Sequence, residues 1–338
     1  EIKRFNSIDV MRSIAIILMV QVHFVQNLSQ PEQNPLFIGV RYFLELAAPF
    51  FTFLVGVSLA ISLTKQYFLG KTEQQIAFRT IKRAFFIFLL GLVFAVAIWS
   101  PEDLFDWDIL TFIGFSILIL FLLRKISFIG LSFIAVIIIL ISPPLRDWAK
   151  YFSYWEMSIY PPDFNYDFTF RDVFLGFWIN GYFPVFPWLV FPLIGFGIGN
   201  WLMAESGEKK NRHLRLLLLG LILIVFSIVG TFINSNFKSA DIVSWYASEL
   251  EFYPATTTFV LGSLGITIVF FWVLHRLFDF RQASGDWLIF FRRYSRFSLT
   301  TYVIHHAIHL WPLWLAGILL HNEKMYYYAN ITTPIILV

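Results

Sequence analysis

Stretches of about 20 apolar residues recur along the whole of this 338-residue sequence, and they constrain its fold more than any other feature. A helix of about 20 such residues matches the hydrocarbon thickness of a bilayer. The sequence therefore predicts an all-α, polytopic transmembrane helical bundle of about ten spans, built as one domain over residues 1–338. We expect the spans at 8–28, 41–64, 79–98, 108–123, 127–142, 186–204, 215–234, 253–275, 296–320 and from 331 to Val338.

The composition supports lipid as the solvent of this chain. It is 58% hydrophobic and only 14% charged, whereas a soluble domain carries about 25% charged residues. We therefore expect an integral membrane protein in contact with membrane lipids, without a nucleic-acid partner. Because the chain has no cysteine, disulfides, thiol catalysis and thiolate metal sites are excluded. A homo-oligomer is compatible with the sequence.

The distribution of basic residues predicts the orientation of the bundle. If the N-terminus is cytoplasmic and the loops alternate, 19 of the 25 Lys and Arg residues fall at the inner face. Cytoplasmic loops carry such an excess of positive charge. The six basic residues expected outside are Arg41, Arg146, Lys150, Arg171, Lys238 and Lys324.

The longest stretch without an expected span is residues 143–185, which we place on the outer side. It begins at Pro143-Pro144 and contains Trp148, Trp155 and Trp178 among many Tyr and Phe residues. A loop of this length usually has its own structure or a function. Its aromatic residues suit packing at the membrane interface, and they also suit a rim that binds a polar acceptor such as a glycan.

The first apolar segment contains ionisable residues, which are costly inside a membrane and often functional. Asp9 and Arg12 are three residues apart and can pair on one helix face, while Ser7 or Asp9 can cap the helix start. Arg12 is also suited to a phosphate-bearing ligand, because a guanidinium matches phosphate in a bidentate way. His23 lies about 21 Å further along the helix axis. It either hydrogen-bonds to a neighbouring helix or acts as a general base.

The ninth expected span contains a second polar group, formed by Tyr302, His305, His306 and His309. His305 and His309 share a helix face, a spacing that can bind zinc. No HExxH motif, acid or thiol accompanies them, so the sequence favours a hydrogen-bonding or acid/base role and no metal. We expect one of these histidines to face His23 across a central cavity.

Six segments, taken in order, resemble the transmembrane acyltransferases, in particular the heparan-α-glucosaminide N-acetyltransferase-like branch and its bacterial relatives. The first is Ile8–Ala15, with Asp9 and Arg12 in the DxxR pattern. Each segment is a weak signal alone, but the ordered set spans most of the chain. The other five segments are Ala48–Gly56, Lys82-Arg83 before Leu90–Leu92, Asp108–Gly114, Phe186–Leu189 and Ser298–His305.

The resemblance implies an acyltransferase that takes an acetyl or acyl group from cytoplasmic acyl-CoA and transfers it to a carbohydrate on the far side of the membrane. It also favours the bacterial cytoplasmic membrane. Ser13 stands where the family usually has glycine. The lysosomal member uses a histidine in the loop after the first span, and the corresponding residues here, 26–40, contain no histidine. His23, which matches the first-span histidine of bacterial members, is therefore our candidate catalytic residue.

The expected site has a catalytic part and a donor-binding part. His305 and Tyr302 are the expected catalytic partners of His23, and the basic inner face suits the anionic phosphates of acetyl-CoA, the expected co-substrate. The residues predicted to bind it are Arg12 with Asp9 beside it, Lys82, Arg83 and Arg296.

Two other functions are compatible with the same helices. A transporter or flippase of a glycan or lipid-linked substrate would need no acyl-transfer chemistry, but such proteins often contain an internal repeat that is not evident here. A purely structural membrane subunit is disfavoured by the histidines and arginine within the spans.

Overall fold

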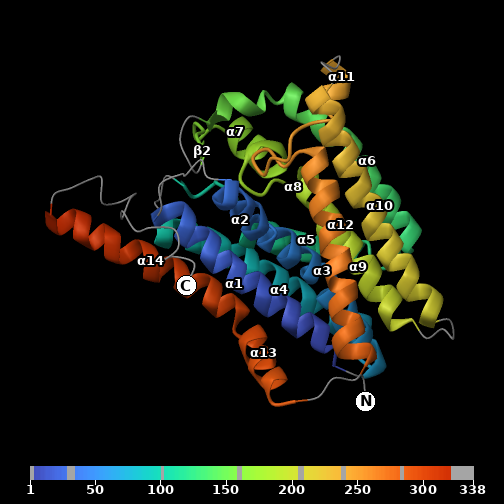
Figure 1. Ribbon diagram of the computed structural model, residues 1–338. Coiled ribbons are helices and arrows are strands. Elements are labelled where there is room, and N and C mark those ends of the chain that lie inside the picture. Colours follow the sequence, from blue (N-terminus) through green and yellow to red (C-terminus); the bar gives the residue numbers. More distant parts are fainter. Residues whose placement is uncertain are drawn as a thin grey trace.

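The computed structural model describes residues 4–28, 35–99, 103–157, 162–204, 209–236, 241–281 and 285–320, and these segments are almost entirely helical (Figure 1). The α-helices are α1 Asn6–Leu28, α2 Pro35–Glu45, α3 Ala47–Phe68, α4 Glu73–Phe94, α5 Ile109–Leu122, α6 Phe128–Trp148, α7 Phe170–Leu175, α8 Val185–Trp188, α9 Val190–Met203, α10 Lys209–Asn236, α11 Asp241–Ser244, α12 Thr257–Leu274, α13 Trp287–Arg296 and α14 Ser298–Leu320. The shorter elements are the π-helical turns η1 Ala95–Trp99, η4 Gly176–Asn180 and η5 His275–Phe280, the 3₁₀ turn η3 Tyr151–Tyr154, and the antiparallel pair β1 Trp155–Glu156 and β2 Asp163–Phe164.

The all-α polytopic fold predicted from the sequence is confirmed. Within the described residues, seven helical segments are long and apolar enough to cross a membrane. The shorter α5 and the C-terminal α14 coincide with two further expected spans. The tenth expected span, from 331, lies outside the described residues, so the total of about ten stays a prediction. The seven segments are Asn6–Val25, Gly39–Phe68, Glu73–Ile98, Phe128–Trp148, Phe170–Met203, His213–Asn236 and Thr257–Phe280.

Side-chain caps define where several of these helices begin. Thr72 and Gln75 form a reciprocal capping box at the start of α4. Ser127 and Thr256 cap α6 and α12 by accepting a hydrogen bond from a backbone N–H of the first turn. Each cap satisfies N–H groups that have no partner inside the helix. The helix boundaries therefore follow from local sequence.

The described part of region 143–185 has a structure of its own, which was one of the two explanations that its length suggested. Helix α6 continues through Pro143 and Pro144 to Trp148, although each proline lacks an N–H donor and its ring crowds the preceding helical turn. The buried Arg146 secures this last turn by donating to the carbonyl oxygen of Ala255 at 2.6 Å. The rest of the region forms η3, the β-strand pair, α7 and η4, which lie together at one end of the bundle in Figure 1.

Helices α3 and α9 cross at the centre of the bundle with their backbones almost in contact. A Cβ atom at Gly56 would lie 2.1 Å from the carbonyl oxygen of Pro192, and one at Gly195 would lie 2.1 Å from that of Phe53. Only glycine fits at either position. Small residues that let two helix backbones approach closely are typical of helix interfaces in membranes. Around it, α1 packs against α3, α13 and α14, while α10 pairs with α12.

A buried carboxylate from the end of η5 fixes the start of α1. Asp279 Oδ1 accepts hydrogen bonds from the backbone N–H groups of Asn6, at 2.6 Å, and Ser7, at 3.3 Å. The Ser7 hydroxyl donates to Oδ2 of the same carboxylate, which also lies 2.8 Å from His275 Nδ1. Asp279 thus supplies the cap that the sequence assigned to Ser7 or Asp9. It places a negative charge at the positive end of the helix dipole.

Replacing Asp279 with alanine should destabilise the protein by about 1–3 kcal/mol, because buried donors of α1 would lose their acceptor. Thermal unfolding of the purified protein in detergent would show this as a lower midpoint. Asp286→Ala is the matched control, because Asp286 is exposed and makes no side-chain cap for α13. Equal midpoints for the two variants would contradict this role of Asp279.

Candidate active site

Arg12 lies where three helices meet. From α1 it donates through Nη2 to the Ser58 hydroxyl on α3, at 2.6 Å, and through Nη1 to the Ser295 hydroxyl on α13, at 2.8 Å. Two neutral hydroxyls orient the guanidinium without cancelling its charge. The residue is therefore held in place and still carries a positive charge that an anion can use.

A cavity of about 430 Å³ begins at Arg12 and runs between α1, α3, α4, α5 and α14. We call it the central cavity. Arg83 and Arg296 also line it, whereas Tyr302 and Leu110 belong to its apolar walls. Its lining includes both Arg12 and Met19 of α1, which are about 10 Å apart along the helix axis. The cavity thus connects a cationic region with an aromatic, largely apolar one.

A second cavity of about 340 Å³ shares Arg83 with the first and extends the cationic region. Lys65, Lys71 and Arg79 line it, and we call it the basic cavity. Among the described residues that line the two cavities, no side chain is a carboxylate. Lys65, Lys71 and Arg79 were not among the donor-binding residues predicted from the sequence. The spacing of Arg79 and Arg83, four residues apart on one helix face, was the available signal.

Two residues predicted to bind acyl-CoA lie elsewhere. Asp9 is buried and forms an ion pair with Arg4, at 2.7 Å between Oδ2 and Nε, instead of pairing with Arg12. Lys82 is exposed and lies outside the lining of both cavities. Of the predicted set, the structure therefore brings together Arg12, Arg83 and Arg296.

Three histidines from the two ends of the chain meet beside the central cavity. The His23 ring centroid on α1 is 5.4 Å from that of His305 and 4.3 Å from that of His306 on α14. The two α14 rings are 4.1 Å apart, and both residues are buried. We call these three residues the histidine cluster. His23 thus faces the ninth-span histidines as expected, while the side chain of His309 lies outside the described residues.

Tyr302 connects the histidine cluster to the central cavity. Its ring contacts those of His305 and His306, with centroid distances of 5.6 and 5.4 Å. Its hydroxyl donates to Asp108 Oδ2 at 2.7 Å, while Oδ1 of the same carboxylate caps α5 through the Leu110 N–H. The sequence placed Asp108 at the start of the expected span 108–123 without giving it a role in the site. Its position immediately before an apolar helix was the signal of a cap.

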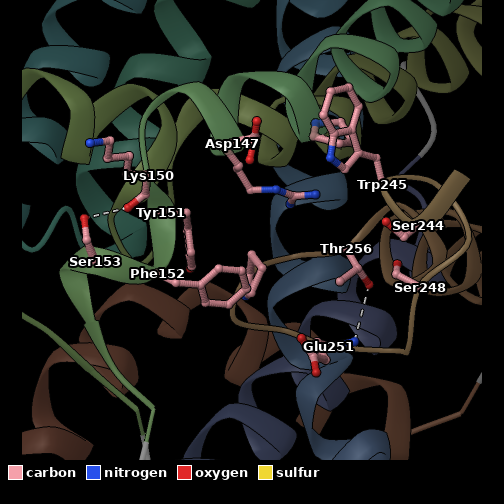
Figure 2. A pocket seen from close by; sticks show the side chains of 13 residues that line it. Asp147, Lys150, Tyr151, Phe152, Ser153, Ser244, Trp245, Ser248, Glu251 and Thr256 are labelled. Atoms are coloured by element: carbon pink, nitrogen blue, oxygen red, sulfur yellow. Dashed lines mark hydrogen bonds between the residues drawn. The ribbon is translucent and has the colours of Figure 1, made fainter. Parts of the chain in front are cut away.

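A third cavity, of about 470 Å³, opens at the other end of the bundle, between the end of α6 and the segment before α12. We call it the loop cavity. Figure 2 shows Tyr151 and Phe152 on one wall, with Trp245, Ser248 and Glu251 opposite them. Burial and the charge of the nearby Glu249 raise the pKa of the Glu251 carboxyl. Aromatic faces, hydroxyls and charges of both signs make this cavity suitable for a polyhydroxylated ligand.

An aromatic layer separates the loop cavity from the centre of the bundle. Tyr151 stacks on Trp155, which stacks on Tyr253, with centroid distances of 5.6 and 5.1 Å. Tyr182 packs edge-on against Tyr253 and donates its backbone N–H to the carbonyl oxygen of Asp106. Burial raises the pKa of the Asp106 carboxyl to about 9. Of the tryptophans that the sequence placed in this region, Trp155 belongs to this packed layer, whereas Trp148 is exposed.

Comparison with known families connects this geometry to an activity. The chain matches the family described as heparan-alpha-glucosaminide N-acetyltransferase, catalytic, over residues 4–225. That region contains Arg12, His23, Arg83 and Asp108, whereas Tyr302 and the α14 histidines lie beyond it. Among curated proteins, no match was found. Since the family match covers more than half of the chain and agrees with the ordered motifs, this protein belongs to the heparan-α-glucosaminide N-acetyltransferase catalytic-domain family.

Proposed function

We propose that this protein transfers an acetyl group from cytoplasmic acetyl-CoA to a carbohydrate at the opposite side of the membrane. The observation that supports this most is the central cavity, which extends from Arg12, Arg83 and Arg296 to Tyr302, beside the histidine cluster. Acetyl-CoA has an anionic head and a long neutral arm, which are complementary to the cationic end and the apolar walls of this cavity. Membership of an N-acetyltransferase family supports the same reaction.

The cationic end is the proposed site for the CoA nucleotide. Its diphosphate and 3′-phosphate carry several negative charges, and the basic cavity adds Lys65, Lys71 and Arg79 to the arginines of the central cavity. Most of these basic side chains are exposed, so the nucleotide would reach them directly from water, while Arg12 is half-buried. The pantetheine arm would then lie along the apolar walls, which brings the thioester toward Tyr302.

The loop cavity is the proposed site for part of the carbohydrate acceptor. Phe152 and Trp245 offer aromatic faces for stacking on a sugar ring, while Ser248, Glu251 and Lys150 offer hydrogen bonds to hydroxyls. Such a mixture of aromatic and polar groups is typical of small-molecule sites. The aromatic layer below would position the acceptor relative to the buried centre.

The histidine cluster is the proposed catalytic centre, with His23 as the general base. An amine or hydroxyl of the acceptor attacks the thioester carbonyl while the imidazole of His23 accepts its proton. The new C–N or C–O bond forms, the C–S bond breaks, and the proton is returned to the CoA thiolate. His305 contacts His23, and Tyr302, held by Asp108, positions the α14 side of the centre.

Arg12→Ala should weaken CoA binding about 10–100-fold, because a charge-assisted phosphate contact contributes about 1.5–3 kcal/mol. Calorimetry with CoA on the purified protein measures this, and raised salt should weaken wild-type binding as well. Arg171→Ala is the matched control, since Arg171 is exposed and lies outside the lining of both cavities. A folded, monodisperse wild type that does not bind CoA would instead favour a transporter or flippase.

His23→Ala should reduce acetyl transfer about 10²–10⁴-fold, which is the usual contribution of a general base. CoA affinity and thermal stability should stay close to wild type, because the lost group acts on the reacting proton. Thiol release from acetyl-CoA in the presence of a carbohydrate acceptor is the measurement. If His23→Ala kept its activity while His305→Ala or His306→Ala lost it, an α14 histidine would be the base.

The loop cavity should face the outside and the basic cavity the cytoplasm. In this Cys-free chain, Lys150→Cys should react with an impermeant maleimide in intact cells, whereas Lys125→Cys should react only after lysis. Both side chains are exposed in the structure, so access to the reagent depends on the side of the membrane. The reverse labelling pattern would invert the proposed direction of transfer.

A further inference from the structure

The histidine cluster has a geometry that proton transfer alone does not require. Each of His23, His305 and His306 offers one ring nitrogen such that the three atoms all lie within 4.8 Å of one another. Three nitrogens bound to one zinc ion at about 2.0–2.1 Å are separated by roughly 3.3 Å in a tetrahedral arrangement. Small side-chain rotations, each moving a ring nitrogen by about 1 Å, would bring the three into that arrangement.

We propose that the histidine cluster is a binding site for a divalent transition-metal ion, zinc in particular, and that the bound ion inhibits acetyl transfer. Neutral imidazole is a preferred ligand of zinc, and three histidines leave a fourth position for water or substrate. The sequence disfavoured a metal because no acid or thiol lies near His305. The third ligand instead comes from α1, 282 residues earlier in the chain.

The surroundings of the cluster orient at least one ligand. His305 Nδ1 lies 3.1 Å from the carbonyl oxygen of Thr301, which can only accept a hydrogen bond. Nδ1 of His305 therefore carries the proton, and Nε2 presents its lone pair. A metal-bound histidine typically donates its other N–H to a carbonyl or carboxylate in this way. The local helix geometry thus selects the ring tautomer that a metal requires.

The Asp108 carboxyl group is linked to the histidine cluster through Tyr302. The Asp108 carboxylate accepts the Tyr302 hydroxyl, and the Tyr302 ring contacts both α14 histidines. On the remaining side, the Phe94 ring packs 5.1 Å from that of His306 and excludes solvent.

Metal binding and general-base catalysis compete for the same lone pair. An imidazole nitrogen that coordinates zinc cannot accept a proton from the acceptor. The inhibition therefore rests on the proposed function, but the binding does not. Zinc and acceptor deprotonation are alternative uses of His23, which makes the ion a regulator of this site.

The test measures zinc binding directly on the full chain, purified with a tag free of histidine. After exposure to zinc and removal of the excess, elemental analysis should find about one ion per wild-type chain. His306→Asn and His23→Ala should lower the zinc affinity at least about 100-fold, beyond the 10–100-fold typical of changes to outer partners. Zinc should also raise the unfolding midpoint of wild type and leave that of these variants unchanged.

His213→Ala is the matched control, because His213 packs against His275 in a different histidine pair, away from the cluster. It should bind zinc like wild type. Cobalt should give the visible absorption of a tetrahedral site, without thiolate bands because the chain has no cysteine. The binding proposal is overturned if wild type retains no zinc, or if His306→Asn retains as much as wild type does.

The inhibitory role has a separate readout. In protein that transfers acetyl groups, saturating zinc should stop thiol release and a chelator should restore it. Full activity with zinc bound would overturn the inhibitory role. If no transfer occurs even without zinc, the proposed function fails, and elemental analysis and cobalt absorption still decide whether the metal site exists.

Discussion

The attachment of α1 to Asp279 is the constraint on which the rest of the site depends. Helix α1 carries Arg12 and His23, which are fixed relative to each other by the helix. What remains free is the position of α1 along and around its own axis. The buried carboxylate of Asp279 accepts three hydrogen bonds at the helix start and removes that freedom. An unsatisfied polar group is costly in apolar surroundings, so the start of α1 keeps this attachment. The attachment in turn fixes the position at which Arg12 contacts Ser58 and Ser295.

The two chemical requirements of the proposed acetyl transfer would be met by separate parts of the fold. Binding an anionic donor needs positive charge near water, which Arg79 and Arg83 of α4 supply together with Arg12. Proton transfer needs an imidazole that can accept a proton, and His305 and His306 of α14 are buried, with the His306 ring packed against that of Phe94. Tyr302 belongs to both regions, since it lines the central cavity and contacts the histidines. The cavity between them lets one flexible donor reach both.

The sequence predicted the parts of this structure that depend on local composition. The apolar stretches predicted the spans, and the cost of ionisable groups in a membrane singled out Arg12 and His23. Contacts between residues that are far apart in the sequence could not be predicted in this way. Asp9 lies close in the sequence to both Arg4 and Arg12, so either arginine could pair with it. Only the structure shows that Asp9 forms its ion pair with Arg4. Nothing near Asp108 or Asp279 in the sequence reveals their roles. These roles depend on contacts with helices more than a hundred residues away.

The crossing of α3 and α9 also determines how the protein responds to its lipid surroundings. In hydrocarbon, helices gain little from burying apolar side chains, so the close backbone contact at Gly56 and Gly195 relies on shape. The span that contains α9 is 83% buried, whereas that of α10 is 17% buried and faces mainly lipid. Hydrophobic mismatch acts on lipid-facing helices through tilt. A thicker or thinner bilayer should therefore tilt α10 first, while the central crossing keeps the spacing between the helices of the site.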